Sequence, residues 1–179
     1  MSAESRWRAA LAEHRASIES YAAAVRSLDD AAWTRPWAEG KWTPAQVTEH
    51  LTLGYRAFLR EVRGEGGMKM KVFGLRLRLL RWFLLPHILF HRSFPAGAVS
   101  PREIRPVEGS PDRDAALAEL LATAAEAERE IEAARDRPGA VLTHPYFGGI
   151  PLARGLKFAA VHVEHHTRQV RAAASAAAP

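Results

Sequence analysis

Three histidines fall within five residues in the stretch Val161-His162-Val163-Glu164-His165-His166-Thr167-Arg168-Gln169, which does most to determine the fold. Apolar residues around it recur at steps of three and four residues, which predicts an amphipathic helix over about 151–174. On that helix His162 and His166 lie one turn apart at the edge of the apolar stripe, with Gln169 beside them. His165 lies further from the stripe, so two of the three histidines point toward one side of a core.

A second strong helix signal starts at Thr43-Pro44-Ala45-Gln46. Thr43 can cap the helix, Pro44 suits its first turn, and Gln46 completes a capping box. We therefore predict a helix over about 43–63, ended by the glycines that follow.

His50 lies at the edge of the apolar stripe of this second helix. If the two helices are neighbours, His50, His162 and His166 meet and supply three nitrogen ligands to one metal ion. Three such ligands leave coordination positions open for water or for a substrate. The same side chains could instead be hydrogen-bonded at a polar seam between helices, and the spacing alone leaves both interpretations open.

Two further helices are predicted over about 5–28 and 111–136. Links of roughly a dozen residues join the first helix to the second and the third to the fourth, which favours antiparallel neighbours. More than forty residues separate the second helix from the third, enough to cross the length of a helix. We predict an all-α four-helix bundle of up-down-down-up order, a single domain over 1–179, with a partly helical crossover and loops at about 29–42 and 143–149.

The crossover carries a basic amphipathic insertion at about 68–92, with six Lys and Arg residues and no acidic residue. Its alternating pattern is compatible with a strand, but its richness in Leu and Arg favours a helix that breaks at Pro86. Such a helix could cover the bundle with its cationic groups in water, or could touch an anionic membrane surface. The rest of the chain is close to neutral, so nucleic acid is not an expected partner.

The composition limits the chemistry that the chain can perform. Of 179 residues, 47% are hydrophobic and 25% are charged, as in ordinary globular domains. The absence of cysteine excludes disulfides, thiolate ligands and a cysteine nucleophile. The N-terminal residues are charged and lack the apolar core of a signal peptide, so the expected location is cytoplasmic.

Three stretches resemble motifs of the DinB-like (YfiT-type) superfamily, namely Trp42–Leu51, His162–Gln169 and His144-Pro145-Tyr146-Phe147-Gly148. The resemblance covers nearly the whole chain in order and spacing, except for residues 68–92. It implies a four-helix bundle with a divalent metal held by three histidines, here His50, His162 and His166. Zinc or nickel is the expected ion, with iron and manganese as alternatives. The expected neighbours of the site are His165, Gln169, Gln46 and Tyr146.

The resemblance also implies a class of activity. Characterised relatives are S-transferases that use low-molecular-weight thiols such as bacillithiol or mycothiol, and others are isomerases or hydrolases. The expected function is therefore a metal-dependent thiol transferase or hydrolase that acts on a small molecule, with its catalytic residues unassigned. A non-catalytic metal-binding module, or one that uses residues 68–92 at a membrane surface, is the alternative. Relatives often dimerise, so a homodimer is a further expectation.

Overall fold

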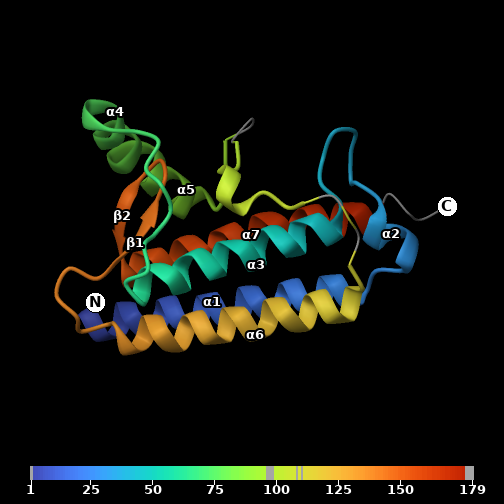
Figure 1. The fold of residues 1–179 in the computed structure, drawn as a ribbon, viewed down its shortest axis with the longest axis horizontal. Coiled ribbons are helices and arrows are strands. Elements are labelled where there is room, and N and C mark those ends of the chain that lie inside the picture. The colour runs from blue at the N-terminus through green and yellow to red at the C-terminus, as the bar shows by residue number, and fades with distance from the viewer. Residues whose placement is uncertain (1, 96–98, 108, 110, 176–179) are drawn as a thin grey trace.

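In the described part of the chain four long helices are present, and they run side by side (Figure 1). The computed structural model describes residues 2–95, 99–107, 109 and 111–175. The long helices are α1 (Ala3–Arg26), α3 (Pro44–Val62), α6 (Arg113–Ala133) and α7 (Leu152–Ser175). Each of the four predicted long helices is present with bounds within three residues of those expected, and the mainly helical fold is confirmed.

The long helices associate as two pairs, α1 with α7 and α3 with α6. In Figure 1, α1 and α7 run away from the end where the N-terminus lies, and α3 and α6 run back toward it. Their apolar stripes bury a common core that includes Tyr21 and Val25 of α1, Leu51 of α3, Leu120 of α6 and Val163 of α7. Burial of these stripes, rather than helix propensity alone, holds such helices in place.

Side chains close the helix ends as the sequence requires. Thr43 Oγ1 accepts a hydrogen bond from Gln46 N–H, while Gln46 Oε1 accepts one from Thr43 N–H, which completes the predicted capping box of α3. Asp112 Oδ1 accepts from Ala115 N–H at 2.8 Å at the start of α6. Such caps satisfy backbone donors that the first helical turn leaves unpaired.

A β-hairpin replaces part of the predicted loop at 143–149. Strand β1 (Val141–His144) pairs antiparallel with β2 (Gly148–Pro151), so that Leu142 lies opposite Ile150 and both are buried. The strands have four residues each, too few for a period-two pattern to stand out in the sequence. The predicted loop after the first helix likewise contains a short helix, α2 (Asp30–Thr34), which Asp29 caps.

The basic segment forms one helix that Pro86 does not break. It consists of α4 (Gly74–Leu79), a π-helical turn (Leu80–Leu84) and α5 (Leu85–His91). A proline clashes with the carbonyl four residues before it, here that of Trp82. The π-helical turn avoids this clash, because Leu85 N–H donates to the Leu80 carbonyl five residues back. The predicted break at Pro86 is therefore wrong, and Met68–Phe73 lies outside any helix.

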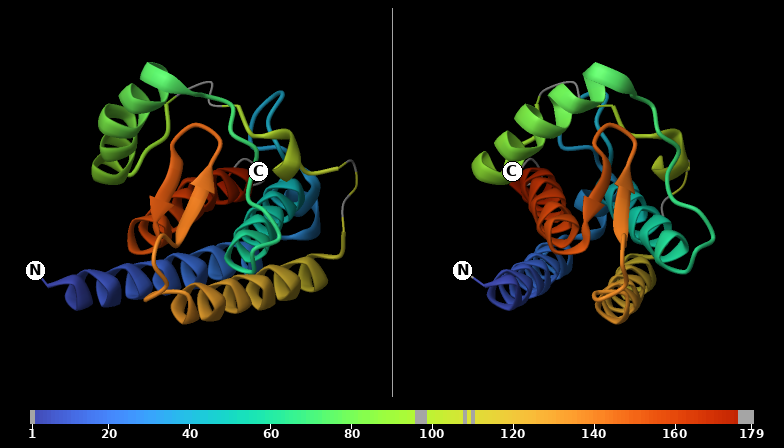
Figure 2. Two further views of the ribbon diagram at one scale, coloured as in Figure 1. Left: turned by 60° about the vertical axis from the view of Figure 1, so that its left-hand side comes forward. Right: turned by 90° about the vertical axis from the view of Figure 1, so that its left-hand side faces the viewer.

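The helix over residues 74–91, which we call the crossover helix, lies on the same side of α3 and α7 as the β-hairpin (Figure 2). Leu85 and Ile88 of the crossover helix pack with Phe147 and Ile150 of the hairpin and with Phe158 of α7. A short 3-10 helix, Arg102–Ile104, follows before α6. The crossover helix and the hairpin therefore cover one flank of α3 and α7.

No helix in the described ranges combines the length and hydropathy needed to cross a bilayer. The assignment of residues 1–179 to one domain stays a prediction, and residues 1 and 176–179 lie outside the described part of the chain.

Candidate metal centre

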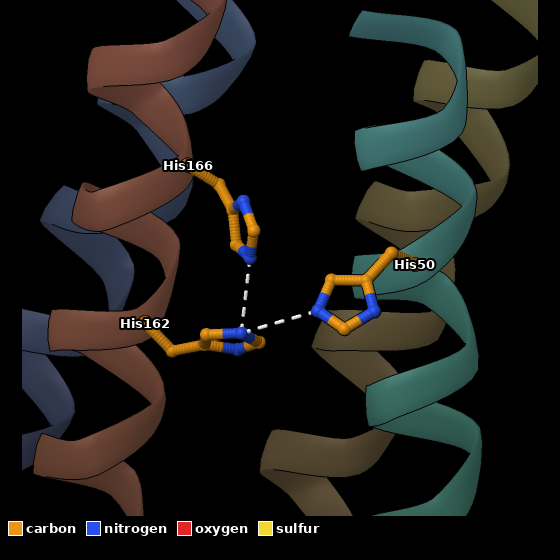
Figure 3. A group of neighbouring side chains, drawn as sticks. All are labelled: His50, His162 and His166. Atoms are coloured by element: carbon orange, nitrogen blue, oxygen red, sulfur yellow. Dashed lines mark hydrogen bonds between the residues drawn. The ribbon is translucent and has the colours of Figure 1, made fainter. Parts of the chain in front are cut away.

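Helices α3 and α7 bring His50, His162 and His166 together (Figure 3). One ring nitrogen from each histidine lies within 4.8 Å of the others. His162 Nε2 lies 3.2 Å from His50 Nε2 and 3.0 Å from His166 Nε2. The structure thus brings together the three side chains that we predicted as ligands, although His50 and His162 are 112 residues apart in the sequence.

Two of these imidazoles are oriented by partners outside the cluster. His50 Nδ1–H donates to the Ile104 carbonyl oxygen at 2.6 Å, and His166 Nδ1–H donates to Gln169 Oε1 at 2.7 Å. A neutral imidazole carries one proton, so in both residues Nε2 is left with a lone pair. Both lone pairs point toward His162.

This arrangement suits a cation. His162 Nε2 can donate a proton to His50 or to His166, but not to both. In at least one of these two nitrogen–nitrogen contacts, which measure 3.0 and 3.2 Å, two lone pairs therefore face each other with no proton between them. A divalent ion accepts all three lone pairs at once. Outer hydrogen bonds, such as those that His50 and His166 donate to the Ile104 carbonyl and Gln169 Oε1, are the usual way to orient ligating histidines.

Burial keeps the three imidazoles neutral. It lowers the pKa of His50 to about 4, although the Ile104 carbonyl opposes this shift. Burial, reinforced by the neighbouring imidazoles, also lowers the pKa of His162 and His166 well below the ordinary histidine value. The side chains are therefore in the deprotonated form that binds metal at neutral pH.

The cluster borders a cavity of about 580 Å³. Leu80, Leu84 and Ile88 of the crossover helix form part of its wall, and Phe158 of α7 contributes to another. Its lining is mainly apolar, with Tyr146 and two cationic side chains, Lys41 and Arg76, as further polar groups. An apolar cavity with a few polar groups is typical of small-molecule sites.

The expected neighbours of the cluster separate into two groups. Gln169 joins His166 to His165, because its Nε2 donates to His165 Nε2 at 3.0 Å. His165 and Tyr146 line the cavity, and the Tyr146 hydroxyl donates to the Val99 carbonyl at 3.5 Å. Gln46, by contrast, is engaged in the capping box of α3 and does not line the cavity. It is a helix-capping residue rather than a neighbour of the site.

His144 is a cavity residue that the sequence did not single out as a site candidate. It ends β1 and stacks on Phe147 with ring centroids 4.6 Å apart. Burial lowers its pKa to about 3. In the sequence, only its place in the motif His144–Gly148 pointed to His144. Its position in the cavity depends on the β-hairpin, which the sequence did not predict.

Comparison with known proteins agrees with this geometry. A profile of the DinB superfamily matches residues 10–170, a range that contains the cluster, the hairpin and the crossover helix. Neither the curated proteins nor the solved structures include a significant match. Metal binding is typical of the superfamily, and the described chain contains a three-histidine group able to hold an ion. Because the profile spans most of its length, the chain belongs to the DinB superfamily.

Proposed function

We propose that this protein is a divalent-metal-dependent enzyme that transfers a low-molecular-weight thiol to a small molecule or hydrolyses a small molecule. The observation that carries the proposal is the three Nε2 atoms that converge beside a cavity of about 580 Å³. Sites with three protein ligands and a neighbouring cavity are typical of catalytic rather than structural metal centres. We interpret α1, α3, α6 and α7 as an up-down-down-up four-helix bundle that serves as the rigid scaffold.

The residues of the chain have separable roles in this proposal. His50, His162 and His166 would hold the ion, while Ile104 and Gln169 keep the rings of His50 and His166 in the required tautomer. A divalent ion at this position would supply Lewis-acid activation of a water molecule or of a thiol at neutral pH. Zinc or nickel is the proposed ion because every protein ligand is an imidazole, and iron or manganese is the alternative.

The cavity suggests how substrates would be bound. Apolar walls from the crossover helix and Phe158 would bind the apolar part of an electrophile and exclude water. Lys41 and Arg76 line the same cavity and would bind carboxylates of a thiol cosubstrate. The chain has no cysteine, so a reacting thiol would have to come from such a cosubstrate.

The metal site is tested by elemental analysis of the purified protein and of two matched variants. His162→Ala/His166→Ala removes two proposed ligands. His87→Ala/His91→Ala removes another pair with the same spacing, exposed on α5. We expect the first variant to lose the metal and the second to retain it. Equal metal content in the two variants would refute the assignment.

The reaction class is tested with metal-loaded protein and a panel of substrates. Thiol consumption with electrophiles, measured with and without protein, reports transferase activity, and product release from esters and amides reports hydrolase activity. Either activity should disappear in His162→Ala/His166→Ala. Turnover that survives in this variant would exclude the cluster as its source, and no turnover at all would favour a non-catalytic metal-binding protein.

A further inference from the structure

Large apolar side chains gather on the outer face of the crossover helix. Eight such side chains are exposed in the described part of the chain, and six of them lie between residues 73 and 90. Their exposed fractions range from 49% to 81% for Phe73, Leu75, Leu79, Trp82, Phe83 and Phe90. Isolated exposed apolar residues are ordinary, but a contiguous group of this kind marks an interaction surface.

The spacing of these residues places them on one side of the helix. Leu75, Leu79, Trp82 and Phe83 follow one another at i, i+4, i+7 and i+8, and Phe90 follows Phe83 by two turns. Leu85 and Ile88 face the other way and are buried against the hairpin and α7. The helix is therefore apolar on its packed side and also on its open side.

The same segment carries uncompensated positive charge. Lys69, Lys71, Arg76, Arg78 and Arg81 are all exposed, and the range 68–92 contains no acidic residue. None of these five residues makes an ion pair with any described part of the chain. The remaining basic residue of the segment, Arg92, is instead neutralised by Glu13 and Glu164.

We propose that this face, defined by Phe73, Leu75, Leu79, Trp82, Phe83 and Phe90 with their basic neighbours, docks on the surface of an anionic lipid bilayer. Aromatic and leucine side chains enter the boundary between headgroups and acyl chains, while Lys and Arg contact anionic headgroups. The helix would lie in the plane of the surface, which agrees with the absence of a membrane-spanning helix among the described residues.

A second copy of the chain fits this face less well. A symmetric dimer would place the same surface against itself. Five unpaired cations from each subunit would then meet across an interface to which residues 68–92 contribute no carboxylate. Like charges brought together in this way oppose association. An anionic surface supplies the missing counter-charges.

Docking in this orientation has a consequence for the cavity. Leu80, Leu84 and Arg76 belong to the docking helix and also line the cavity beside the three histidines. A single layer of helix therefore separates the proposed membrane surface from the candidate metal centre. The docking proposal rests only on the outer face and does not require the metal.

Co-sedimentation of the full-length protein with vesicles tests the proposal. The vesicles contain phosphatidylcholine with phosphatidylserine, or phosphatidylcholine alone, each at low and high salt. We expect binding to the anionic vesicles at low salt, weakened by high salt because screening shortens the range of the charges. Failure to bind the anionic vesicles, or equal binding to both kinds of vesicle at low salt, would overturn the proposal.

Two variants with matched controls separate the contributions of charge and apolar contact. Arg78→Gln/Arg81→Gln should weaken binding roughly 10-fold or more, because two cations near the surface are lost. Arg26→Gln/Arg60→Gln makes the same change of net charge at exposed positions of α1 and α3 and should bind as the wild type does. Equal weakening of vesicle binding in both variants would show that only the net charge of the protein matters, and would contradict a defined docking face.

Trp82→Ser/Phe83→Ser removes apolar contact without changing the charge and should also weaken binding, whereas Val107→Ser, at an exposed position outside the face, should not. Circular dichroism and metal content of every variant show whether the fold and the metal centre are intact. Analytical ultracentrifugation tests the competing occupant. A wild-type dimer that becomes a monomer in Trp82→Ser/Phe83→Ser would assign the face to a second copy and overturn the proposal.

Discussion

Gln169 accepts a hydrogen bond from His166 Nδ1–H at 2.7 Å and thereby directs the free lone pair of this histidine toward His162. The same amide donates to His165, so its two ends are both committed. A side chain with both ends hydrogen-bonded cannot rotate without losing a contact. Gln169 is therefore a positioning residue for the candidate metal centre.

Replacing Gln169 with Ala should weaken metal binding about 10- to 100-fold, the usual effect of losing an outer partner of a ligating histidine. The measurement is competition with a chelator of known affinity. Gln46→Ala is the matched control, because it removes the same amide from a capping box and not from the cluster. It should lower helix stability slightly and leave metal affinity unchanged. Equal affinity in both variants would exclude the positioning role.

His50→Ala and His165→Ala should differ in their effect on metal affinity. His50 belongs to the group of converging nitrogens, so its loss should weaken binding at least ~10-fold. His165 lies outside the group and its Nε2 is occupied by Gln169, so its loss should have little effect. Isothermal titration with zinc and with nickel provides the measurement. A larger loss for His165→Ala would contradict the assignment of ligands.

Acid stability should depend on Glu128 of α6. The hydrogen bond from His14, followed by that from Arg15, lowers the pKa of this carboxyl to about 2, and partial burial opposes the shift. A carboxyl with a lowered pKa in the folded state stabilises that state above its unfolded pKa. This contribution is fully present above the ordinary glutamate pKa of 4.5 and is lost as the pH falls through about 2.

Glu128→Gln should therefore lower the thermal midpoint at neutral pH, and its difference from the wild type should shrink as the pH approaches 2. Glu132→Gln, at an exposed position of the same helix, is the control and should show little change at any pH. A constant difference for Glu128→Gln down to the lowest pH would show that the ionised carboxylate does not contribute.

Two glycines should respond in opposite ways to alanine. Gly54 lies within α3, and a Cβ placed there meets no atom within 4 Å, so Gly54→Ala should stabilise the fold by about 0.5–1 kcal/mol. Gly64 follows α3 with φ of +81°, where an alanine is strained, so Gly64→Ala should destabilise it. Denaturant unfolding measures both. The metal content of Gly54→Ala should stay unchanged despite its position in the cavity wall.

Local patterns predicted the helices and the histidine cluster because the information lies within a few turns of chain. The capping box of Thr43 and Gln46 forms as expected, and the spacing of His162 and His166 places both on the side of α7 that faces α3. The DinB-like resemblance, read from three short motifs, is confirmed by the profile. Within each motif the deciding residues are neighbours in the sequence, although His50 lies 112 residues from His162.

The features that were missed depend on distant parts of the chain. The two sides of the hairpin are held by different partners, because Leu142 packs with Leu156 of α7 and Ile150 packs with Leu85 and Ile88 of the crossover helix. Strands of four residues do not reveal such contacts in the sequence. The helix passes Pro86 through a π-helical turn, and the packing of Leu85 and Ile88 holds it there. The Ile104 carbonyl reaches His50 from 54 residues away. No pattern within a single helix contains these contacts.

The position of the histidines across two helix pairs couples metal binding to folding. His50 comes from the α3–α6 pair, and His162 and His166 come from the α1–α7 pair. An ion that binds all three would cross-link the pairs and would bind the folded chain in preference to the unfolded one. By mass action, a free ion at 100 times its dissociation constant adds about 2.7 kcal/mol to stability. The melting temperature would then rise with the free metal concentration, so thermal unfolding could be used to measure that concentration.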